Sequence, residues 1–268
     1  MPVGIKADLP VEVPQSMLAT LCSKPRYGYQ IKFNGEYRTI CKYADGSIAD
    51  FNREGNVGKG LPPALVAALK KHPLPQFVIA GELVGNRTFH LFDALILGDL
   101  TLAAEGYGVR EVAYHAKFDD FSKLIIPVET ARIELAKAEL AIQAMEDGCE
   151  GIIIRDMQAP YVEGESRQHM KVKFWKTLEA IVMGASSHSK NSVRLGCYDD
   201  QGKLHEICGA STLGKKFTPR RGDIVEVKYN KGTRNLHIME ISMQRIRDDK
   251  RPEQCLLSQI VVNKEFRQ

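Results

Sequence analysis

The residues best suited to chemistry surround Lys32, in the sequence YQIKFNGEYR. A lysine amine attacks phosphorus only when it is neutral, and a reference pKa of about 10.4 leaves almost none neutral at pH 7. A site that uses such an amine must therefore lower its pKa by desolvation or by nearby cations. The apolar neighbours Ile31 and Phe33 and the distant cations Lys171 and Lys173 are candidates for these two effects.

Two carboxylates and an aromatic ring fit the same chemistry. A nucleotide brings several negative charges, which call for a divalent metal held by carboxylates and for cations along the phosphates. Glu82 and Glu150 each adjoin a glycine in an apolar run, where a charge is otherwise costly. A surface glutamate at a strand edge is the simpler alternative for each. Phe92 offers a flat face to a purine, and an ordinary core position explains it equally well.

Composition describes an ordinary globular protein without strong bulk charge. The chain has 268 residues, 44% hydrophobic and 26% charged, and a formal net charge of +4. Any nucleic-acid surface must therefore come from local clusters of cations. The six cysteines form no Cys-x-x-Cys pair, which favours reduced thiols over a zinc site. The absence of a long apolar run and of a signal-peptide core predicts a cytoplasmic protein that does not enter the membrane.

Turn signals and apolar runs predict the elements of the first part of the chain. Asn34-Gly35 predicts a β-hairpin that mounts Lys32, and Asp45-Gly46 predicts a second turn. Further strands are expected at 77–84, 88–97, 150–155 and 170–175, and a short helix at 62–71. A longer helix is predicted from Val128 to Asp147, with a core stripe formed by Leu135, Ala138, Ile142 and Met145.

The last third of the chain has a different texture, with short strands and turns. Strands at 193–198, 223–229 and 235–241 have the spacing of a small Greek-key barrel. We therefore predict an α+β protein of antiparallel sheets with flanking helices, followed by a small β-barrel. The boundary is placed between residues 182 and 183, giving domains 1–182 and 183–268.

Taken together, these residues resemble the covalent nucleotidyltransferases, the group of DNA ligases, RNA ligases and mRNA capping enzymes. The nucleotidyl-lysine motif of that group is similar to KFNG at 32–35. Further clusters follow in the family's order: FNREG at 51–55, GELV at 81–84, FD at 92–93, EGIIIR at 150–155, KVK at 171–173 and RIRDDK at 245–250. The last cluster, together with SMLA at 16–19, is most similar to ATP-dependent DNA ligases, in which Arg-x-Asp-Lys ends an OB domain.

The resemblance implies a nucleotidyltransferase domain followed by an OB-fold domain, and it implies roles for single residues. Lys32 would be adenylylated, Gln30 would read the adenine edge, and Phe92 would stack on the base. Arg53 would contact the ribose or the nick phosphate. The other nucleotide contacts that it implies are Ile31, Arg38, Glu82, Glu150, Lys171, Lys173, Arg247 and Lys250.

Within that set the resemblance distinguishes three tasks. Glu82 and Glu150 would serve the metal, Mg²⁺ or Mn²⁺, and the sugar. The lysine pair at 171 and 173 would hold the α-phosphate, and the pair Arg247 and Lys250 would grip the leaving pyrophosphate. Two positions depart from the family pattern. Asn34 replaces the usual Asp, and Tyr37 stands where the family usually has Arg. Arg38 is a possible substitute, although neighbouring strand residues point to opposite faces.

The reaction that the resemblance implies has three steps. Lys32 attacks the α-phosphate of ATP to give lysine-AMP and pyrophosphate, AMP passes to the 5′-phosphate of a nick, and the 3′-hydroxyl then displaces AMP. The expected partner is nicked double-stranded DNA, bound by a monomer. A basic cluster in the OB domain favours contact with the DNA backbone over a charged surface that is merely exposed to solvent. Its expected DNA-binding residues, to which Arg53 is added, are Lys215, Lys216, Arg220, Arg221, Lys228 and Lys231.

Two other functions remain open at this stage. An RNA ligase or a capping-type nucleotidyltransferase would share Lys32 and the carboxylates but act on another polynucleotide. A catalytically silent DNA-binding protein with an OB fold would form no covalent adduct with ATP.

Overall fold

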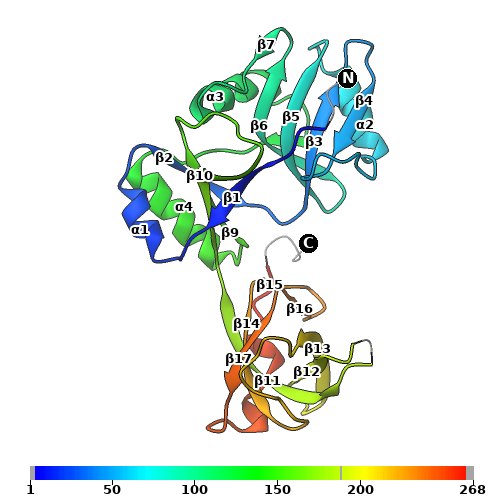
Figure 1. Ribbon diagram of the computed structural model, residues 1–268, viewed down its shortest axis with the longest axis vertical. Coiled ribbons are helices and arrows are strands. Elements are labelled where there is room, and N and C mark those ends of the chain that lie inside the picture. Colours follow the sequence, from blue (N-terminus) through cyan, green and yellow to red (C-terminus); the bar gives the residue numbers. More distant parts are fainter. Residues whose placement is uncertain (1–3, 188, 264–268) are drawn as a thin grey trace. The chain divides into compact units, whose positions relative to one another are not determined.

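A computed structural model describes residues 4–187 and 189–263 and divides the chain into two compact units, Met1–Lys173 and Phe174–Gln268 (Figure 1). Each unit has its own apolar core. Within the described ranges, the model contains no helix with the length and apolarity that a membrane span requires.

The first sheet of the first unit has the strand order β1-β10-β9-β2. Its strands are β1 (Asp8–Glu12), β2 (Tyr27–Lys32), β9 (Gly151–Asp156) and β10 (Gly164–Lys173). Strand β9 is antiparallel to both of its neighbours, as expected, whereas β1 runs parallel to β10. A parallel pair needs a long connection, and here most of the first unit lies between the two strands.

The second sheet has the order β4-β3-β5-β6-β7, and β8 pairs with β6 in parallel. Its strands are β3 (Glu36–Lys42), β4 (Ile48–Phe51), β5 (Phe77–Val84), β6 (Thr88–Leu97), β7 (Leu100–Thr101) and β8 (Ile125–Pro127). The predicted strands at 77–84 and 88–97 are confirmed. Ile40, Ile79 and Phe89 are fully buried in the core beneath this sheet.

The predicted hairpin at Asn34-Gly35 is wrong. Strand β2 pairs with β9, whereas β3 pairs with β4 and β5, so the chain passes from one sheet to the other here. Gly35 serves close approach, because a Cβ at this position would lie 2.4 Å from the carbonyl oxygen of Leu83. The turn at Gly46 is confirmed, since it joins the antiparallel strands β3 and β4 and has φ +79°.

Four α-helices complete the first unit. They are α1 (Met17–Cys22), α2 (Pro63–Lys71), α3 (Tyr107–Phe118) and α4 (Glu134–Glu146). The predicted helix at 62–71 is confirmed as α2, and α3 was not predicted. Figure 1 shows α1 and α4 side by side near the first sheet, and α3 against β6.

Helix α4 begins later than predicted and buries a different face. Leu135 and Ile142 are 65% and 54% exposed, so the predicted core stripe is wrong. The buried face carries Ala141, Ala144 and Lys137. The small alanines allow close approach to the sheet, and the Lys137 amine donates to two backbone carbonyls at 3.0 and 3.2 Å. Apolar periodicity therefore misidentified the packed face.

The second unit is built on one five-stranded antiparallel sheet, β13-β12-β11-β14-β17. Its strands are β11 (Lys176–Ala185), β12 (Ser192–Tyr198), β13 (Leu204–Ser211), β14 (Ile224–Tyr229) and β17 (Ser242–Ile246). The outer strands β13 and β17 also contact each other, although no ladder joins them within the described residues. This curled, partly open sheet is the form expected of an OB fold.

Two sequence expectations change in this unit. The strand predicted at 235–241 is reduced to β16 (Ile238–Met239), which pairs with β15 (Lys231–Gly232), because Leu236 and Glu240 adopt positive φ angles. The predicted boundary between 182 and 183 falls inside β11. Every described partner of that strand is β12 or β14, so β11 belongs wholly to the second unit.

The exposed stripe of α4 gives a direct test by mutation. Ile142→Ala should change the free energy of unfolding by less than about 0.5 kcal/mol, because the side chain already faces water. The matched change Ile152→Ala, in a fully buried strand position, should cost about 2–5 kcal/mol. Urea unfolding of both variants measures the difference. Equal losses would show that α4 packs through its apolar stripe after all.

Candidate active site

A cavity of about 250 Å³ in the first unit is lined by side chains from both of its sheets. Most of the predicted nucleotide contacts of this unit lie there: Gln30, Ile31, Lys32, Arg53, Glu82, Phe92 and Lys171. The other lining residues are Asp8, Leu9, Pro10, Phe33, Gly35, Tyr37, Val128, Ile153 and Arg155. The fold thus gathers residues from seven separate strands and several loops around one space.

Strand register explains how the cations come together. Lys32 of β2 and Lys173 of β10 oppose the same residue of β9, and Gln30 and Lys171 likewise share one partner. Residues opposed across a sheet point to the same face. The pKa of Lys171 is lowered by burial and then by the nearby charges of Lys173 and Lys32. The register therefore concentrates positive charge beside the cavity.

The Lys32 amine is held by a carboxylate. Its Nζ lies 2.5 Å from Oε1 of Glu150, whose side chain is 2% exposed, whereas the Lys32 side chain is 20% exposed. Glu150 directly precedes β9, and Lys32 ends β2, so the antiparallel pair of strands brings the two groups together. A carboxylate buried this deeply requires a paired cation. Lys32 thus lines the cavity, and its ion pair with Glu150 holds the amine in place.

Glu82 supplies the second carboxylate of the cavity. Its Oε1 accepts a hydrogen bond from the Gly35 backbone N–H at 3.2 Å. Among residues 4–187 and 189–263, no group of three or more His, Cys, Asp or Glu residues is placed to hold a metal ion. One carboxylate that lines the cavity, Glu82, and a second that is paired with the cavity lysine, Glu150, nevertheless fit Mg²⁺, which is commonly held by one or two carboxylates together with substrate phosphates.

Strand alternation decides whether Arg38 can substitute for the arginine that the family usually has at the position of Tyr37. Tyr37 lines the cavity, whereas Arg38 is buried on the other face of β3. Arg38 Nε lies 3.1 Å from Asp50, and the guanidinium also pairs with Glu36. The predicted nucleotide contact of Arg38 is therefore not supported, because its charge is already engaged away from the cavity.

Arg53 lies on the loop after β4 (Ile48–Phe51) and reaches the cavity from its exposed side. Its side chain is 66% exposed and pairs with Glu54 at 2.6 Å. Asn52 supports this loop, since its Oδ1 accepts from the backbone N–H groups of Glu54 and Asn56, each at 3.0 Å. Arg53 is thus free to change partner when a ligand arrives.

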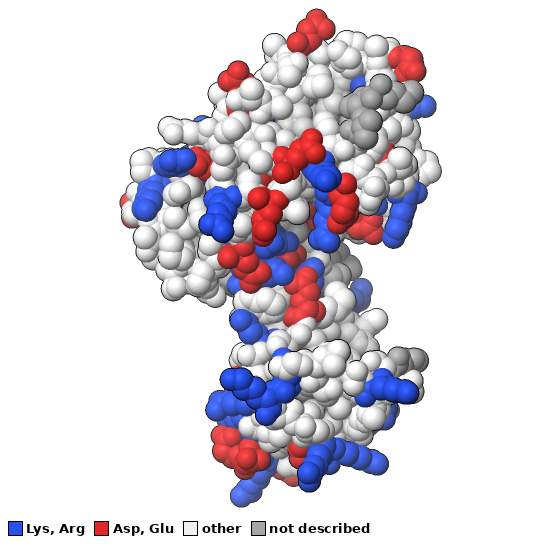
Figure 2. All heavy atoms as spheres, viewed as in Figure 1, with Lys and Arg blue, Asp and Glu red and all other residues white. Residues whose placement is uncertain are grey.

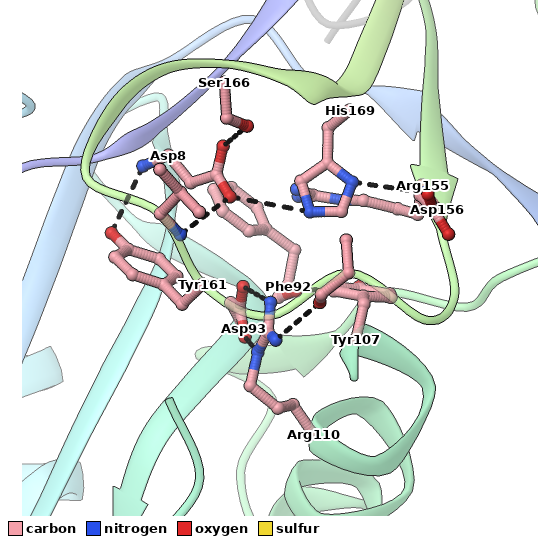
Figure 3. A network of polar contacts seen from close by, with 12 residues as sticks. Asp8, Phe92, Asp93, Tyr107, Arg110, Arg155, Asp156, Tyr161, Ser166 and His169 are labelled. Atoms are coloured by element: carbon pink, nitrogen blue, oxygen red, sulfur yellow. Dashed lines mark hydrogen bonds and ion pairs between the residues drawn. The ribbon is translucent and has the colours of Figure 1, made fainter. Parts of the chain in front are cut away.

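Arg155 is a cavity residue to which the sequence reasoning assigned no role. It ends the EGIIIR cluster, but its role could not be assigned from the sequence alone. Its guanidinium carbon lies 5.0 Å from the ring centre of Phe92 and 4.9 Å from that of Tyr107 (Figure 3). Its Nε donates to Oε1 of Gln30 at 3.0 Å. The available signal was a cation at the end of an otherwise apolar strand.

A buried polar network supports this end of the cavity (Figure 3). Arg110 is fully buried and forms two hydrogen bonds with Asp93, at 2.7 and 3.0 Å. Asp8 accepts from Ser166 at 2.6 Å and lies 3.6 Å from His169. Burial raises the pKa of Asp8 and lowers that of His169 to about 2. These contacts tie α3 to β6 and β1 to β10 at this end of the cavity.

The remaining predicted residues belong to the second unit. Arg247 forms ion pairs with Glu179 at 2.9 Å, Glu226 at 3.2 Å and Asp249 at 2.8 Å. The hydrogen bond to Asp249 is the main cause of a raised pKa of Arg247. Lys250 directly follows Asp249 in the sequence, and its side chain is half-buried. Any contact of Arg247 with a phosphate would require exchange of these carboxylates.

Three residues of the basic cluster in the second unit contact other side chains of the protein. Lys215 donates to Ser242 at 2.8 Å, Lys228 lies 4.6 Å from the ring centre of Trp175, and Lys231 pairs with Glu240 at 2.7 Å. Three further predicted DNA-binding residues are exposed: Lys216, Arg220 and Arg221. Figure 2 shows several groups of Lys and Arg side chains on the visible face of this unit.

Comparisons with known proteins place this geometry in context. No protein-family model matches the chain. DNA ligase C1 of Mycolicibacterium smegmatis is 25% identical, over 78% of this chain and 72% of that protein. The resemblance to ATP-dependent DNA ligases is confirmed. The match covers 253 residues, so it extends far beyond a single motif.

Solved structures of DNA ligases share the fold. A mycobacterial DNA ligase D, solved with ATP and MES, has a TM-score of 0.57 at 17% identity, covering 97% of this chain and 98% of that one. A Lig E DNA ligase, described as binding DNA with a minimal scaffold, has a TM-score of 0.65 at 18% identity, covering 90% and 99%. The predicted α+β class, a nucleotidyltransferase domain followed by an OB fold, is confirmed for this ligase-like chain.

His90 provides a pH test of the cavity wall. It stacks on Phe33, with ring centres 3.9 Å apart, and burial lowers its pKa from 6.5 to about 4. Below pH 6.5 the unfolded chain gains a proton that folded His90 resists, so stability falls as the pH drops toward 4. His90→Phe should remove up to about 2 kcal/mol of the stability difference between pH 7 and pH 5. Urea unfolding at both pH values measures this.

A suitable control is His115→Phe, because that histidine lies near the carboxylates Asp119 and Glu129 at the surface. The control should retain the acid sensitivity contributed by His90. An unchanged difference between pH 7 and pH 5 in His90→Phe would contradict the buried, neutral histidine.

Proposed function

We propose that this chain is an ATP-dependent DNA ligase that seals 5′-phosphate/3′-hydroxyl nicks in duplex DNA and carries AMP on Lys32. The observation that carries the proposal is the Lys32 amine, 2.5 Å from the buried Glu150, facing a cavity that Glu82, Lys171 and Phe92 also line. A nucleophile, acidic groups, cations and an aromatic face are the components that nucleotidyl transfer needs.

In the first step, the Lys32 amine attacks the α-phosphate of ATP, a phosphoramide bond forms, and pyrophosphate leaves. The ammonium must lose a proton before attack, and Glu150 Oε1 is within hydrogen-bond reach of Nζ as an acceptor. Lys171 lines the same cavity and stabilises charge that develops on the α-phosphate. Lys173 lies two residues further along β10 and opposes the same β9 residue as Lys32. Arg247 and Lys250 are proposed to bind the pyrophosphate.

Glu82 and Glu150 are the residues proposed to hold Mg²⁺ or Mn²⁺. A divalent ion offsets the charge of the triphosphate when it is bound. Glu82 faces the cavity from the second sheet, whereas Glu150 approaches from the first. The two sheets therefore each supply one carboxylate.

In the later steps, AMP passes from Lys32 to the 5′-phosphate of a nick, and the 3′-hydroxyl displaces it to close the strand. The exposed Arg53 is proposed to contact the nick phosphate from the cavity edge. The basic residues of the second unit are proposed to bind the DNA backbone, with the protein acting as a cytoplasmic monomer. The comparisons do not favour an RNA ligase or a capping enzyme, since the relatives they identify are DNA ligases.

Adduct formation tests the nucleophile. Incubation with α-labelled ATP and Mg²⁺, followed by denaturing electrophoresis, should label the wild-type chain. Lys32→Ala should reduce labelling at least about a thousandfold, because a covalent step loses its nucleophile. Chelation of the divalent ion should prevent labelling, and added Mg²⁺ or Mn²⁺ should restore it.

Lys32→Arg is the matched control for folding. It preserves a cation beside the buried Glu150, which Lys32→Ala does not, and a guanidinium stays protonated at neutral pH. It should retain the wild-type circular dichroism spectrum and still form no adduct. A labelled Lys32→Arg variant would assign the nucleophile elsewhere, and an unlabelled wild type would favour a silent DNA-binding protein.

Salt dependence tests the basic cluster. Binding of nicked duplex DNA should weaken steeply between low and moderate salt, and Lys216→Ala should reduce the slope of log K against log salt by about 1. Arg245→Ala is the matched control, since this exposed cation already pairs with Glu226 at 2.9 Å and is outside the predicted set. A flat wild-type curve, or equal effects of the two variants, would contradict the assignment.

A further inference from the structure

Helix α4 exposes a row of apolar side chains, which we call the α4 stripe. The stripe consists of Leu135, Ala138, Ile142 and Met145. More than half of the Leu135 and Ile142 side chains and 39% of Met145 are exposed, because the helix packs on the first unit through a different face. Figure 1 shows α4 beside α1 at one edge of that unit. Single exposed apolar residues are ordinary, whereas a contiguous row of them marks an interaction surface.

The spacing of the stripe is that of a seam between two helices. Its residues follow one another at intervals of three, four and three positions, which are the a and d positions of two heptads. A helix face that packs on a globular core is usually wider, because it also has apolar residues at e or g positions. Positions e and g of these heptads hold glutamates and one buried alanine. The α4 stripe therefore has the width of a contact with one further helix.

The charges beside the stripe indicate which kind of helix fits. Along α4, which lies wholly within the described residues, every exposed charged residue is acidic: Glu134, Glu139 and Glu146. They occupy e and g positions, which flank the seam and set the choice of partner. A second copy of α4 would place glutamate against glutamate in either orientation. Lysine or arginine at the facing positions would form ion pairs instead, so the flanks favour a basic partner.

A surface cavity beside the stripe has the same charge preference. Its volume is about 600 Å³. It is lined by Glu129, Thr130, Ala131, Ala136, Glu139, Leu140 and Gln143. Glu139 thus belongs both to the cavity and to the flank of the stripe, and the charged residues of the lining are glutamates. A long cationic side chain from a helix on the stripe could lay its apolar stem against Leu140 and place its charge near these carboxylates.

We propose that the α4 stripe is a docking surface for one amphipathic helix of a partner protein, with apolar residues at a and d positions and lysine or arginine beside them. Helix-on-helix recognition of this kind is a recurring binding mode. The acidic flanks favour such a helix over DNA and over an anionic membrane, because both carry negative charge. This goes beyond the proposed ligase function and does not rest on it, since the lining of the active-site cavity includes no residue of the stripe.

A designed peptide tests the surface with defined chemistry. The probe is about three heptads long, with Ile at a, Leu at d and Lys at e and g, and its like charges keep it from pairing with itself. Fluorescence anisotropy should show that the wild-type chain binds this Lys peptide, more weakly as salt rises. A matched Glu peptide, with Glu in place of every Lys, should bind at least about tenfold more weakly.

Two variants of the chain separate the stripe from its charges. Leu135→Ala/Ile142→Ala should weaken binding of the Lys peptide at least about tenfold, because both side chains lose contact area with the partner. Glu139→Lys should weaken binding of the Lys peptide and strengthen binding of the Glu peptide. Val112→Ala is the matched control, since Val112 is an exposed apolar residue of another helix, α3. It should leave both affinities unchanged. Circular dichroism checks the fold of each variant.

The results decide between this helix and other occupants. Binding of the Lys peptide that the double variant loses and Val112→Ala keeps supports the proposal. Absence of wild-type binding, equal binding of the two peptides, or a folded double variant that binds like the wild type would overturn it. So would a dimer in sedimentation equilibrium that the double variant disperses, which assigns the stripe to a second copy. Binding to vesicles of phosphatidylcholine and phosphatidylglycerol that the double variant loses would assign it to a membrane, with the same consequence.

Discussion

The buried charge of Glu150 is the constraint on which the site depends. Its carboxylate is almost completely removed from water and lies 2.5 Å from the Lys32 amine. Such a charge is tolerated only when a cation compensates it. The antiparallel pairing of β2 with β9 brings the two groups together and places both next to the cavity. The same register directs Gln30 and Arg155 to that space, and the pairing of β9 with β10 adds Lys171.

The parts of the fold that depend on local sequence could be predicted. The apolar run of β5, the hairpin at Gly46 and helix α2 follow from propensity and turn chemistry, which act over a few residues. The sheet to which each strand belongs could not be predicted. Asn34-Gly35 has the sequence of a hairpin, yet Gly35 is required by close approach to Leu83, a contact between distant segments.

The site shows the same division between local and distant information. Motif order identified Lys32, Glu82, Glu150 and Phe92, whose positions can now be described together. Alternation along β3 already raised a doubt about Arg38, and the structure turns it toward Asp50. Arg155 could not be assigned a role from the sequence, because its contacts with Gln30, Phe92 and Tyr107 join distant segments of the chain. The core stripe predicted for helix α4 was wrong because alanines, rather than its large apolar residues, pack against the sheet.

The central claim concerns one nitrogen atom, and peptide mapping tests it most directly. After incubation with ATP and Mg²⁺, the wild-type chain is digested at a pH that preserves phosphoramide bonds and analysed by mass spectrometry. The account predicts that AMP is found on the peptide containing Lys32, at that residue, and that pyrophosphate removes it. AMP on any other residue, or an adduct that pyrophosphate leaves in place, would contradict the account.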